Sequence, residues 1–251
     1  MLPKIKQRLF SIDITIAPYA SFIDRLIEMA VSGVSSYTCV ANVHMLVEAY
    51  KDSSFAEVVN GADLITPDGV PLTVALKLLN GVRQERVAGM DLLPDLLLES
   101  EKKLIPVYFY GGTKDMLIAT EQYCLKKYPL LKIAGMYSPP FRPLTENETN
   151  TVLNQINESN AKFVFVALGC PKQENWMASM RGRINASMIG IGGALPVMIG
   201  TQKRAPKWMQ DTGLEWLYRL MQEPRRLFKR YAVTNSVFLF LLFKAYFKPR
   251  I

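Results

Sequence analysis

The stretch KFVFVALGCPKQENWM, residues 162–177, joins an apolar run to a helical pattern through a turn of glycine and proline. Residues 162–168 have the length and the aromatic and β-branched content of a buried strand, and residues 173–181 have the spacing of an amphipathic helix. A buried strand that leads directly into a helix is the repeating unit of a parallel α/β sheet. This stretch therefore predicts an α/β fold.

The same alternation extends outward in both directions. It predicts a mainly parallel sheet with helices on both faces. The expected strands are 37–41, 63–66, 105–110, 131–137, 162–168 and 187–192, and the expected helices are 22–31, 44–52, 71–80, 90–103, 114–128, 144–159 and 173–181.

Positive charge is concentrated at the C-terminal end. Residues 1–200 contain 19 Lys and Arg and 19 Asp and Glu, whereas residues 201–251 contain 11 and 3, so the whole excess of +8 lies in the last fifth. This asymmetry predicts an anionic partner, either nucleic acid or an anionic membrane surface. We expect an α/β domain over residues 1–200 and a basic, amphipathic appendage over residues 201–251.

Within this appendage a basic cluster, residues 219–231, precedes the apolar run VFLFLLF, residues 237–243. Pro224 should separate two helices, and the second would have cations beside an apolar face, as in helices that lie in the headgroup layer. The run is too short for the roughly 20 residues of a spanning helix. Nucleic acid would leave it exposed, so we expect no nucleic-acid partner. The alternative is a helical pair packed on the domain or on another subunit, which leaves a homo-oligomer open.

Cysteine and histidine form no ligand pattern. The three cysteines are far apart and there is one histidine, so we expect reduced thiols of a cytoplasmic protein and no metal site. The first twenty residues lack the long apolar core of a signal peptide.

Ligands of parallel α/β sheets bind beyond the carboxyl ends of the strands, so the residues that follow the strands are candidate contacts. Gly111, Gly112 and Gly192 would let the backbone approach a phosphate closely. Short turns also use glycine for geometry alone, and neither a dinucleotide fingerprint nor a GxxxxGK[ST] loop is present.

Asp68 has two interpretations. It lies between Pro67 and Gly69, where an aspartate commonly caps the following helix, and composition favours this role. Facing the crevice, the same carboxylate could act as a general base.

Other polar side chains lie in the same predicted crevice. Arg86, Lys172 and Gln173 are well placed to meet a diphosphate or a sugar, although Arg86 could lie in a solvated loop and Lys172 in a solvent-facing helical turn. Asn42 could cap the helix that begins at Val43.

Nine segments resemble, in order, the motifs of the WecG/TagA/CpsF glycosyltransferase family over about residues 37–231. They are ANVHM (41–45), ADLITPDGVPL (62–72), RVAGMDLL (86–93), VYFYGG (107–112), SPPFRPLTENE (138–148), ALGCPKQENWM (167–177), GIGGALP (190–196), KRAPKWMQDTGLEWLYRL (203–220) and EPRRLFKRY (223–231).

The resemblance implies a compact, Rossmann-like α/β catalytic domain and an inverting transfer that needs neither metal nor cofactor. The donor would be a UDP-sugar of the N-acetylmannosamine, N-acetylmannosaminuronic acid or glucose type. The acceptor would be a polyprenyl-diphosphate-linked glycan of bacterial cell-surface polysaccharide or exopolysaccharide synthesis. The protein would lie peripherally on the cytoplasmic face of the inner membrane, where the appendage would hold it and help to close the active site.

By match to the motifs, Asp68 becomes the proposed base, and Asn42, Arg86 and Gln173 become donor-sugar and diphosphate contacts. The substrate-binding set that we expect also includes Gly111, Gly112, Lys172, Gly192, Arg204, Arg219 and Arg226. Val40 stands where members often have threonine, and Leu195 and Pro196 stand where many have phenylalanine and aspartate. The donor sugar could therefore differ from that of the teichoic acid enzymes.

Two other function classes fit parts of the sequence. A non-enzymatic membrane or nucleic-acid adaptor would use the basic segment for binding and the α/β domain as a scaffold. A nucleotide-dependent dehydrogenase would need the missing dinucleotide fingerprint.

Overall fold

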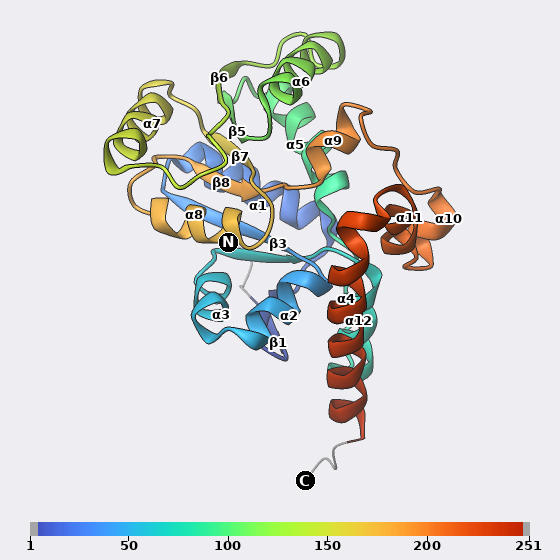
Figure 1. The fold of residues 1–251 in the computed structure, drawn as a ribbon. Coiled ribbons are helices and arrows are strands. Elements are labelled where there is room, and N and C mark those ends of the chain that lie inside the picture. Colours follow the sequence, from blue (N-terminus) through green and yellow to red (C-terminus); the bar gives the residue numbers. More distant parts are fainter. Residues whose placement is uncertain (1–4, 248–251) are drawn as a thin grey trace. The chain divides into compact units, whose positions relative to one another are not determined.

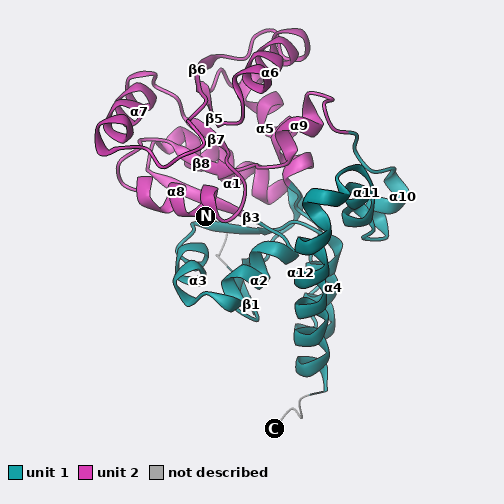
Figure 2. Ribbon diagram, viewed as in Figure 1, with its two compact units in different colours: residues 1–19, 40–88, 203–251 teal, residues 20–39, 89–202 magenta. Residues whose placement is uncertain are grey.

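The computed structural model describes residues 5–247, and these form two compact units (Figures 1 and 2). Within the described residues, unit 1 combines residues 5–19, 40–88 and 203–247, and unit 2 combines residues 20–39 and 89–202. The predicted division into a catalytic domain and an appendage at residue 200 concerns function and stays a prediction. By compactness, the C-terminal segment groups with unit 1.

The central sheet has six strands in the order β4-β3-β8-β7-β5-β6. Every register described in this sheet is parallel, which confirms the mainly parallel α/β fold expected from the sequence. The strands are β3 (Ser36–Ala41), β4 (Leu64–Pro67), β5 (Val107–Gly111), β6 (Ile133–Tyr137), β7 (Phe163–Ala167) and β8 (Ser187–Gly190).

The seven expected helices are all present, each within a few residues of its predicted bounds. They are α1 (Tyr19–Ser32), α2 (Val43–Lys51), α4 (Val70–Asn80), α5 (Gly89–Lys102), α6 (Lys114–Lys127), α7 (Glu146–Glu158) and α8 (Lys172–Met180).

A hairpin near the N-terminus was not expected. Strands β1 (Lys6–Leu9) and β2 (Ile12–Thr15) pair antiparallel, and Leu9, Ile12 and Ile14 are almost fully buried. The alternation of Ile12 and Ile14 with polar residues is the period-2 signal of a half-buried strand. Four-residue strands give only a short version of this signal, which explains why it was missed. Three further elements within residues 5–247 were not predicted, namely α3 (Ser53–Asn60), α9 (Ala194–Met198) and α10 (Lys207–Asp211).

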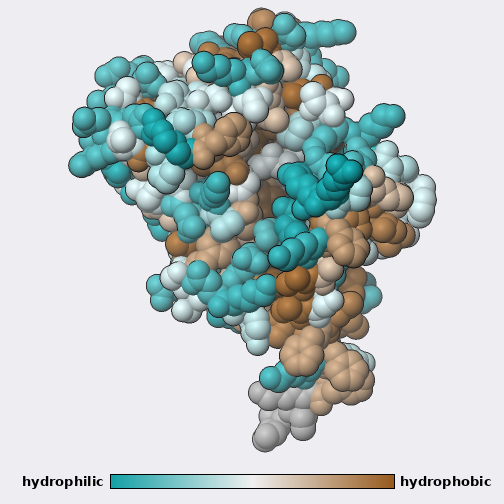
Figure 3. Space-filling view, in the orientation of Figure 1, coloured by the Kyte–Doolittle hydropathy of each residue, from teal (hydrophilic) through white to brown (hydrophobic). Residues whose placement is uncertain are grey.

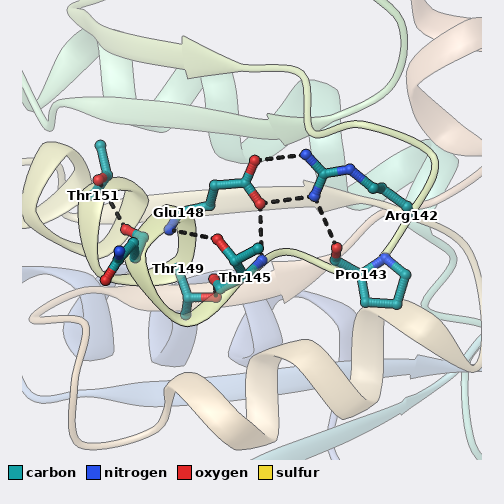
Figure 4. A network of polar contacts seen from close by, with 7 residues as sticks. Arg142, Pro143, Thr145, Glu148, Thr149 and Thr151 are labelled. Atoms are coloured by element: carbon teal, nitrogen blue, oxygen red, sulfur yellow. Dashed lines mark hydrogen bonds and ion pairs between the residues drawn. The ribbon is translucent and has the colours of Figure 1, made fainter.

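The segment before α7 is fixed by a polar network (Figure 4). Thr145 and Glu148 form a capping box in which each side chain accepts from the other residue's backbone N–H. Arg142 donates to both carboxylate oxygens of Glu148, at 2.8 and 2.7 Å. The hydrogen bond from Arg142 is the largest of the interactions that lower the pKa of Glu148 to about 2. Three residues of the SPPFRPLTENE segment therefore start this helix.

The C-terminal segment forms three helices, α10 (Lys207–Asp211), α11 (Glu215–Gln222) and α12 (Pro224–Tyr246). Pro224 is the first residue of α12, as expected for a residue that lacks a backbone N–H and has a helical φ. Helix α12 contacts α2 and α4, and Figure 1 shows it running along α4. Leu227, Phe238 and Leu241 are buried on its inner side.

Much of the remaining surface of α12 is apolar and exposed (Figure 3). Leu239, Phe240 and Phe243 are more than 60% exposed, at 62%, 62% and 65%. An apolar groove of about 540 Å³ lies along this face and includes Leu78 of α4. Among residues 5–247, no helix combines the length and the apolar content needed to cross a bilayer.

Candidate active site

The turn that carries Asp68 is held by backbone hydrogen bonds on two sides. The N–H of Asp68 donates to the carbonyl of Ala41 at 2.7 Å, and the N–H of Val87 donates to the carbonyl of Pro67 at 2.9 Å. The buried Thr66 hydroxyl adds a 3.0 Å bond to the carbonyl of Val87. Because Ala41 precedes Asn42 and Val87 follows Arg86, these bonds bring the Asn42, Asp68 and Arg86 segments of unit 1 together.

Asp68 is not the N-cap of α4, the role that its place between proline and glycine favoured. The N-cap of α4 is Gly69, whose φ of +122° is a conformation that side-chain-bearing residues rarely adopt, and Asp68 stands one residue earlier. The half-buried Asp68 is therefore carried on the turn before the helix.

Asn42 is the N-cap of α2. Its side-chain oxygen accepts from the N–H of Met45 at 3.1 Å, which confirms the predicted cap. The cap fixes Asn42 at the carboxyl end of β3. Asn42 directly follows Ala41, whose carbonyl accepts from the N–H of Asp68.

Arg86 does not lie in a solvated loop. Its Nη1 is 2.7 Å from Oε2 of Glu215 in α11, and the two side chains are only 15% and 19% exposed. Its Nη2 lies 3.5 Å from Oε1 of Gln210 in α10. The loop before α5 is thus tied to the C-terminal segment within unit 1.

A second contact joins the C-terminal segment to the Asp68 turn. Gly213 lies between α10 and α11 with a φ of +77°, and a Cβ at this position would be 3.1 Å from Cβ of Val70. The chain therefore passes close against the first residue of α4, two residues after Asp68.

The three C-terminal arginines of the predicted site lie in different places in unit 1. Arg204 precedes α10 and Arg219 lies on α11, and both are half-buried. Arg226 lies on the first turn of α12, is largely exposed and forms an ion pair with Glu223. The substrate-binding roles of these three arginines stay predictions.

In unit 2, the glycine turns after β5, β7 and β8 are packed together. The N–H of Gly112 donates to the carbonyl of Ala167 at 3.1 Å, and a Cβ on Gly111 would lie only 2.6 Å from that oxygen. The N–H of Gly192 donates to the carbonyl of Val166 at 3.3 Å. The predicted contacts Gly111, Gly112 and Gly192 are therefore neighbours around the end of β7.

Lys172 and Gln173 begin α8, but their surroundings differ. Lys172 is exposed, whereas Gln173 is only 4% exposed. The Oε1 of Gln173 accepts from the N–H of Gly169 at 3.1 Å, and its Nε2 donates to Glu174 at 2.8 Å. One turn later, Trp176 stacks on Tyr110 of β5 with ring centroids 4.0 Å apart, which fixes α8 on the sheet.

Sequence reasoning missed three residues of these two clusters, namely Glu174, Gln210 and Glu215. Each lies in a quoted segment of the family resemblance, but only the structure shows that Gln210 and Glu215 meet Arg86 and that Glu174 is fully buried. In the part of the chain from residue 5 to residue 247, no group of three or more His, Cys, Asp or Glu side chains could hold a metal ion.

The model of the glycosyl transferase WecG/TagA/CpsF family matches residues 7–251, almost the whole chain. The chain belongs to this family. It is therefore a glycosyltransferase, and the family resemblance expected from the nine segments is confirmed.

Two curated relatives of this glycosyltransferase are both described as N-acetylglucosaminyldiphosphoundecaprenol N-acetyl-beta-D-mannosaminyltransferases. The relative from Bacillus subtilis is 36% identical over 211 residues, which cover 82% of this chain and 79% of that protein. The relative from Bacillus spizizenii is 34% identical over 192 residues, which cover 76% of this chain and 73% of that protein.

Proposed function

We propose that this glycosyltransferase moves a sugar from a UDP-sugar donor to a polyprenyl-diphosphate-linked acceptor in the synthesis of a bacterial surface polysaccharide. N-acetylmannosamine is the first donor sugar to test, because both relatives are named for transferring it to N-acetylglucosaminyldiphosphoundecaprenol. The observation that supports the proposal is the pair of backbone hydrogen bonds at the Asp68 turn. These bonds bring the segments of Asp68, Asn42 and Arg86 together in unit 1.

In the proposed reaction, Asp68 is the general base. Its carboxylate accepts the proton of the acceptor hydroxyl as that oxygen attacks the anomeric carbon of the donor. Attack from the face opposite the leaving UDP inverts the configuration at this carbon. The bond from the anomeric carbon to the diphosphate breaks, and its electron pair leaves with UDP.

The other groups bind the donor and neutralise the leaving diphosphate. A guanidinium has five N–H donors, so Arg86 can keep Glu215 and also bind phosphate oxygens. Asn42 and Lys172 are proposed as further polar contacts. The backbone turns at Gly111, Gly112 and Gly192 are proposed to approach the nucleotide, and Arg204, Arg219 and Arg226 to add positive charge.

We propose that residues 201–251 also hold the protein peripherally on the cytoplasmic face of the inner membrane. The exposed apolar face of α12 and the cations Arg225 and Lys229, which are one turn apart, support this role. A membrane-bound acceptor diphosphate would then meet the protein at a basic surface.

The experiment that tests the proposal is a transfer assay with a panel of UDP-sugars and a short prenyl-diphosphate-linked N-acetylglucosamine acceptor, with and without EDTA. We expect transfer from UDP-N-acetylmannosamine, an inverted linkage in the product, and activity that EDTA does not remove. If transfer is obtained only from UDP-glucose or from the uronic acid donor, the first-choice sugar is wrong. The absence of transfer from every UDP-sugar would contradict the proposed donor class.

A further inference from the structure

Glu174 is a buried carboxyl group to which the proposed reaction gives no role. It is 0% exposed, and its Oε1 accepts from Nε2 of Gln173 at 2.8 Å. Its Oε2 is buried as well. Burial raises the pKa of Glu174, and no cation is among the groups that act on it. A protonated, neutral side chain fits these surroundings, because a buried carboxylate without a cation is costly.

The amide of Gln173 is fixed at both ends by its neighbours. Its oxygen accepts from Gly169 in the turn after β7, and its nitrogen donates to Glu174. An inverted amide would place its NH₂ against the N–H of Gly169, two donors face to face. The N–H of Gly169 and the acceptor oxygen of Glu174 together therefore favour one orientation of the Gln173 amide.

The same amide fills space beside the turn after β8. A Cβ on Gly190 would lie 2.7 Å from Nε2 of Gln173, and a Cβ on Gly192 would lie 3.2 Å from its Oε1. Gln173 thus packs between two glycine turns, and any side chain at residue 190 would displace it.

We propose that Gln173 and Glu174 are positioning residues of the transferase reaction: Glu174 orients the Gln173 amide, and that amide holds the turns 168–172 and 190–194 in the shape that binds the donor. This inference rests on the proposed function. It gives Gln173 an indirect role in place of the direct substrate contact that the family resemblance implies. Both amide ends are used inside the protein, and the side chain is only 4% exposed.

The kinetic test compares Glu174→Gln with Glu174→Ala. Glutamine keeps the shape and a carbonyl acceptor for Gln173, so the KM for the donor should stay within about threefold of the wild-type value. Alanine leaves the Gln173 nitrogen without its acceptor, so the donor KM should rise about tenfold or more, with a smaller change in the acceptor KM. Glu121→Ala, which changes an exposed glutamate on α6 in the same unit, is the matched control.

A second readout does not depend on activity. The Gly169 amide donates to Gln173, so NMR should show it protected from hydrogen exchange in the wild type and in Glu174→Gln. In Glu174→Ala this amide should exchange about tenfold faster or more. The exchange result stands even where the wild-type protein transfers none of the tested sugars, which separates a failure of this inference from a failure of the proposed function.

Gly190→Ala provides the same test where Glu174→Ala does not fold. Its Cβ must displace the Gln173 amide, so we expect a raised donor KM and faster exchange at Gly169. Wild-type values of both quantities in Glu174→Ala or Gly190→Ala would overturn the proposal. A Glu174→Gln protein as impaired as Glu174→Ala would also overturn it, because the carboxylate itself would then be required.

Discussion

At the scale of single residues, the backbone of Asp68 is fixed by hydrogen bonds, and Asp68 lies one residue before Gly69, the N-cap of α4. The bonds to Ala41 and from Val87 hold the turn through main-chain atoms, so they do not depend on the identity of the side chain at residue 68. A substitution there can therefore change the chemistry while it leaves the turn in place.

We expect Asp68→Asn to lower turnover by about 100-fold or more. Asparagine has nearly the same shape as aspartate, but its side chain cannot take up the proton of the acceptor hydroxyl. Its thermal unfolding should stay close to that of the wild type. The measurement is kcat under saturating donor and acceptor, with Asp24→Asn on the exposed side of α1 as the control. Near-normal turnover in Asp68→Asn would show that the base lies elsewhere.

Glu174 predicts a pH-dependent stability. Burial raises its pKa above the ordinary value of 4.5, while bonds from Gln173, its own backbone N–H and Cys170 act in the opposite direction. Between the unfolded and the folded pKa, the folded protein keeps a proton that the unfolded chain has released. The contribution of Glu174 to the free energy of unfolding is therefore complete below about pH 4.5 and is lost as the pH rises towards the folded pKa.

The measurement is urea unfolding of the wild type and Glu174→Gln at pH 5 and pH 8. Glutamine cannot ionise, so the variant should gain stability relative to the wild type as the pH rises. Glu121→Gln serves as an exposed reference that should follow the wild-type profile. Parallel profiles for the wild type and Glu174→Gln would show that Glu174 does not titrate in this range.

At the scale of elements, α11 is attached to the loop before α5 by the Arg86–Glu215 ion pair. Removing one partner of a poorly exposed pair leaves the other charge without compensation, whereas exposed pairs contribute little. We expect Glu215→Ala to lower the free energy of unfolding by about 2 kcal/mol. Lys207→Ala, in an ion pair whose side chains are 77% and 59% exposed, should cost about 0.5 kcal/mol or less.

Both values come from urea unfolding of the single variants. A double-mutant cycle with Arg86→Ala should show non-additive effects, because Arg86 and Glu215 are in direct contact. Additive effects, or equal losses in Glu215→Ala and Lys207→Ala, would count against a stabilising role for the pair.

Helix α12 should contribute to membrane binding in two separable ways, through its exposed cations and through its exposed apolar side chains. Arg225 and Lys229 are exposed and one turn apart, and each cation near an anionic surface contributes on the order of 1 kcal/mol. Changing both to glutamine should weaken binding to anionic liposomes by about 30-fold at low salt. Neutralising Lys126 and Lys127, two exposed cations of α6, should have little effect. Sedimentation with anionic and neutral vesicles measures both.

The apolar part of the same helix should respond differently. Phe240→Ser with Phe243→Ser should weaken binding at every salt concentration, because insertion of apolar surface is not screened by salt. Equal binding of the wild type to neutral and anionic vesicles would contradict the electrostatic part of the proposal.

At the scale of the whole molecule, the C-terminal segment is part of the core of unit 1. Leu227, Phe238 and Leu241 of α12 are buried, and this helix contacts α2 and α4. A chain that ends at residue 202 would lose these contacts, each buried side chain contributing about 1.5–3 kcal/mol. We expect its Tm to fall by roughly 10 °C or more and its transfer activity to be lost. Calorimetry and the transfer assay measure both, and an unchanged Tm would show that α12 adds no stability.

The amino-acid sequence was enough to predict the parallel α/β fold, because buried strands and amphipathic helices leave regular patterns along the chain. It also determined the family, because nine short segments occur in order. The two four-residue strands near the N-terminus were missed, since so short an alternation gives little signal.

Which side chains meet could not be predicted from the sequence, because it depends on how distant segments pack. Arg86 and Glu215 are 129 residues apart in the chain but 2.7 Å apart in space, and no local pattern encodes such a pair. The burial of Gln173 and Glu174 likewise follows from packing against the glycine turns after β7 and β8, because the first turn of a helix can be exposed or buried with the same sequence. Local propensity specifies the elements, whereas contacts between distant segments create the site.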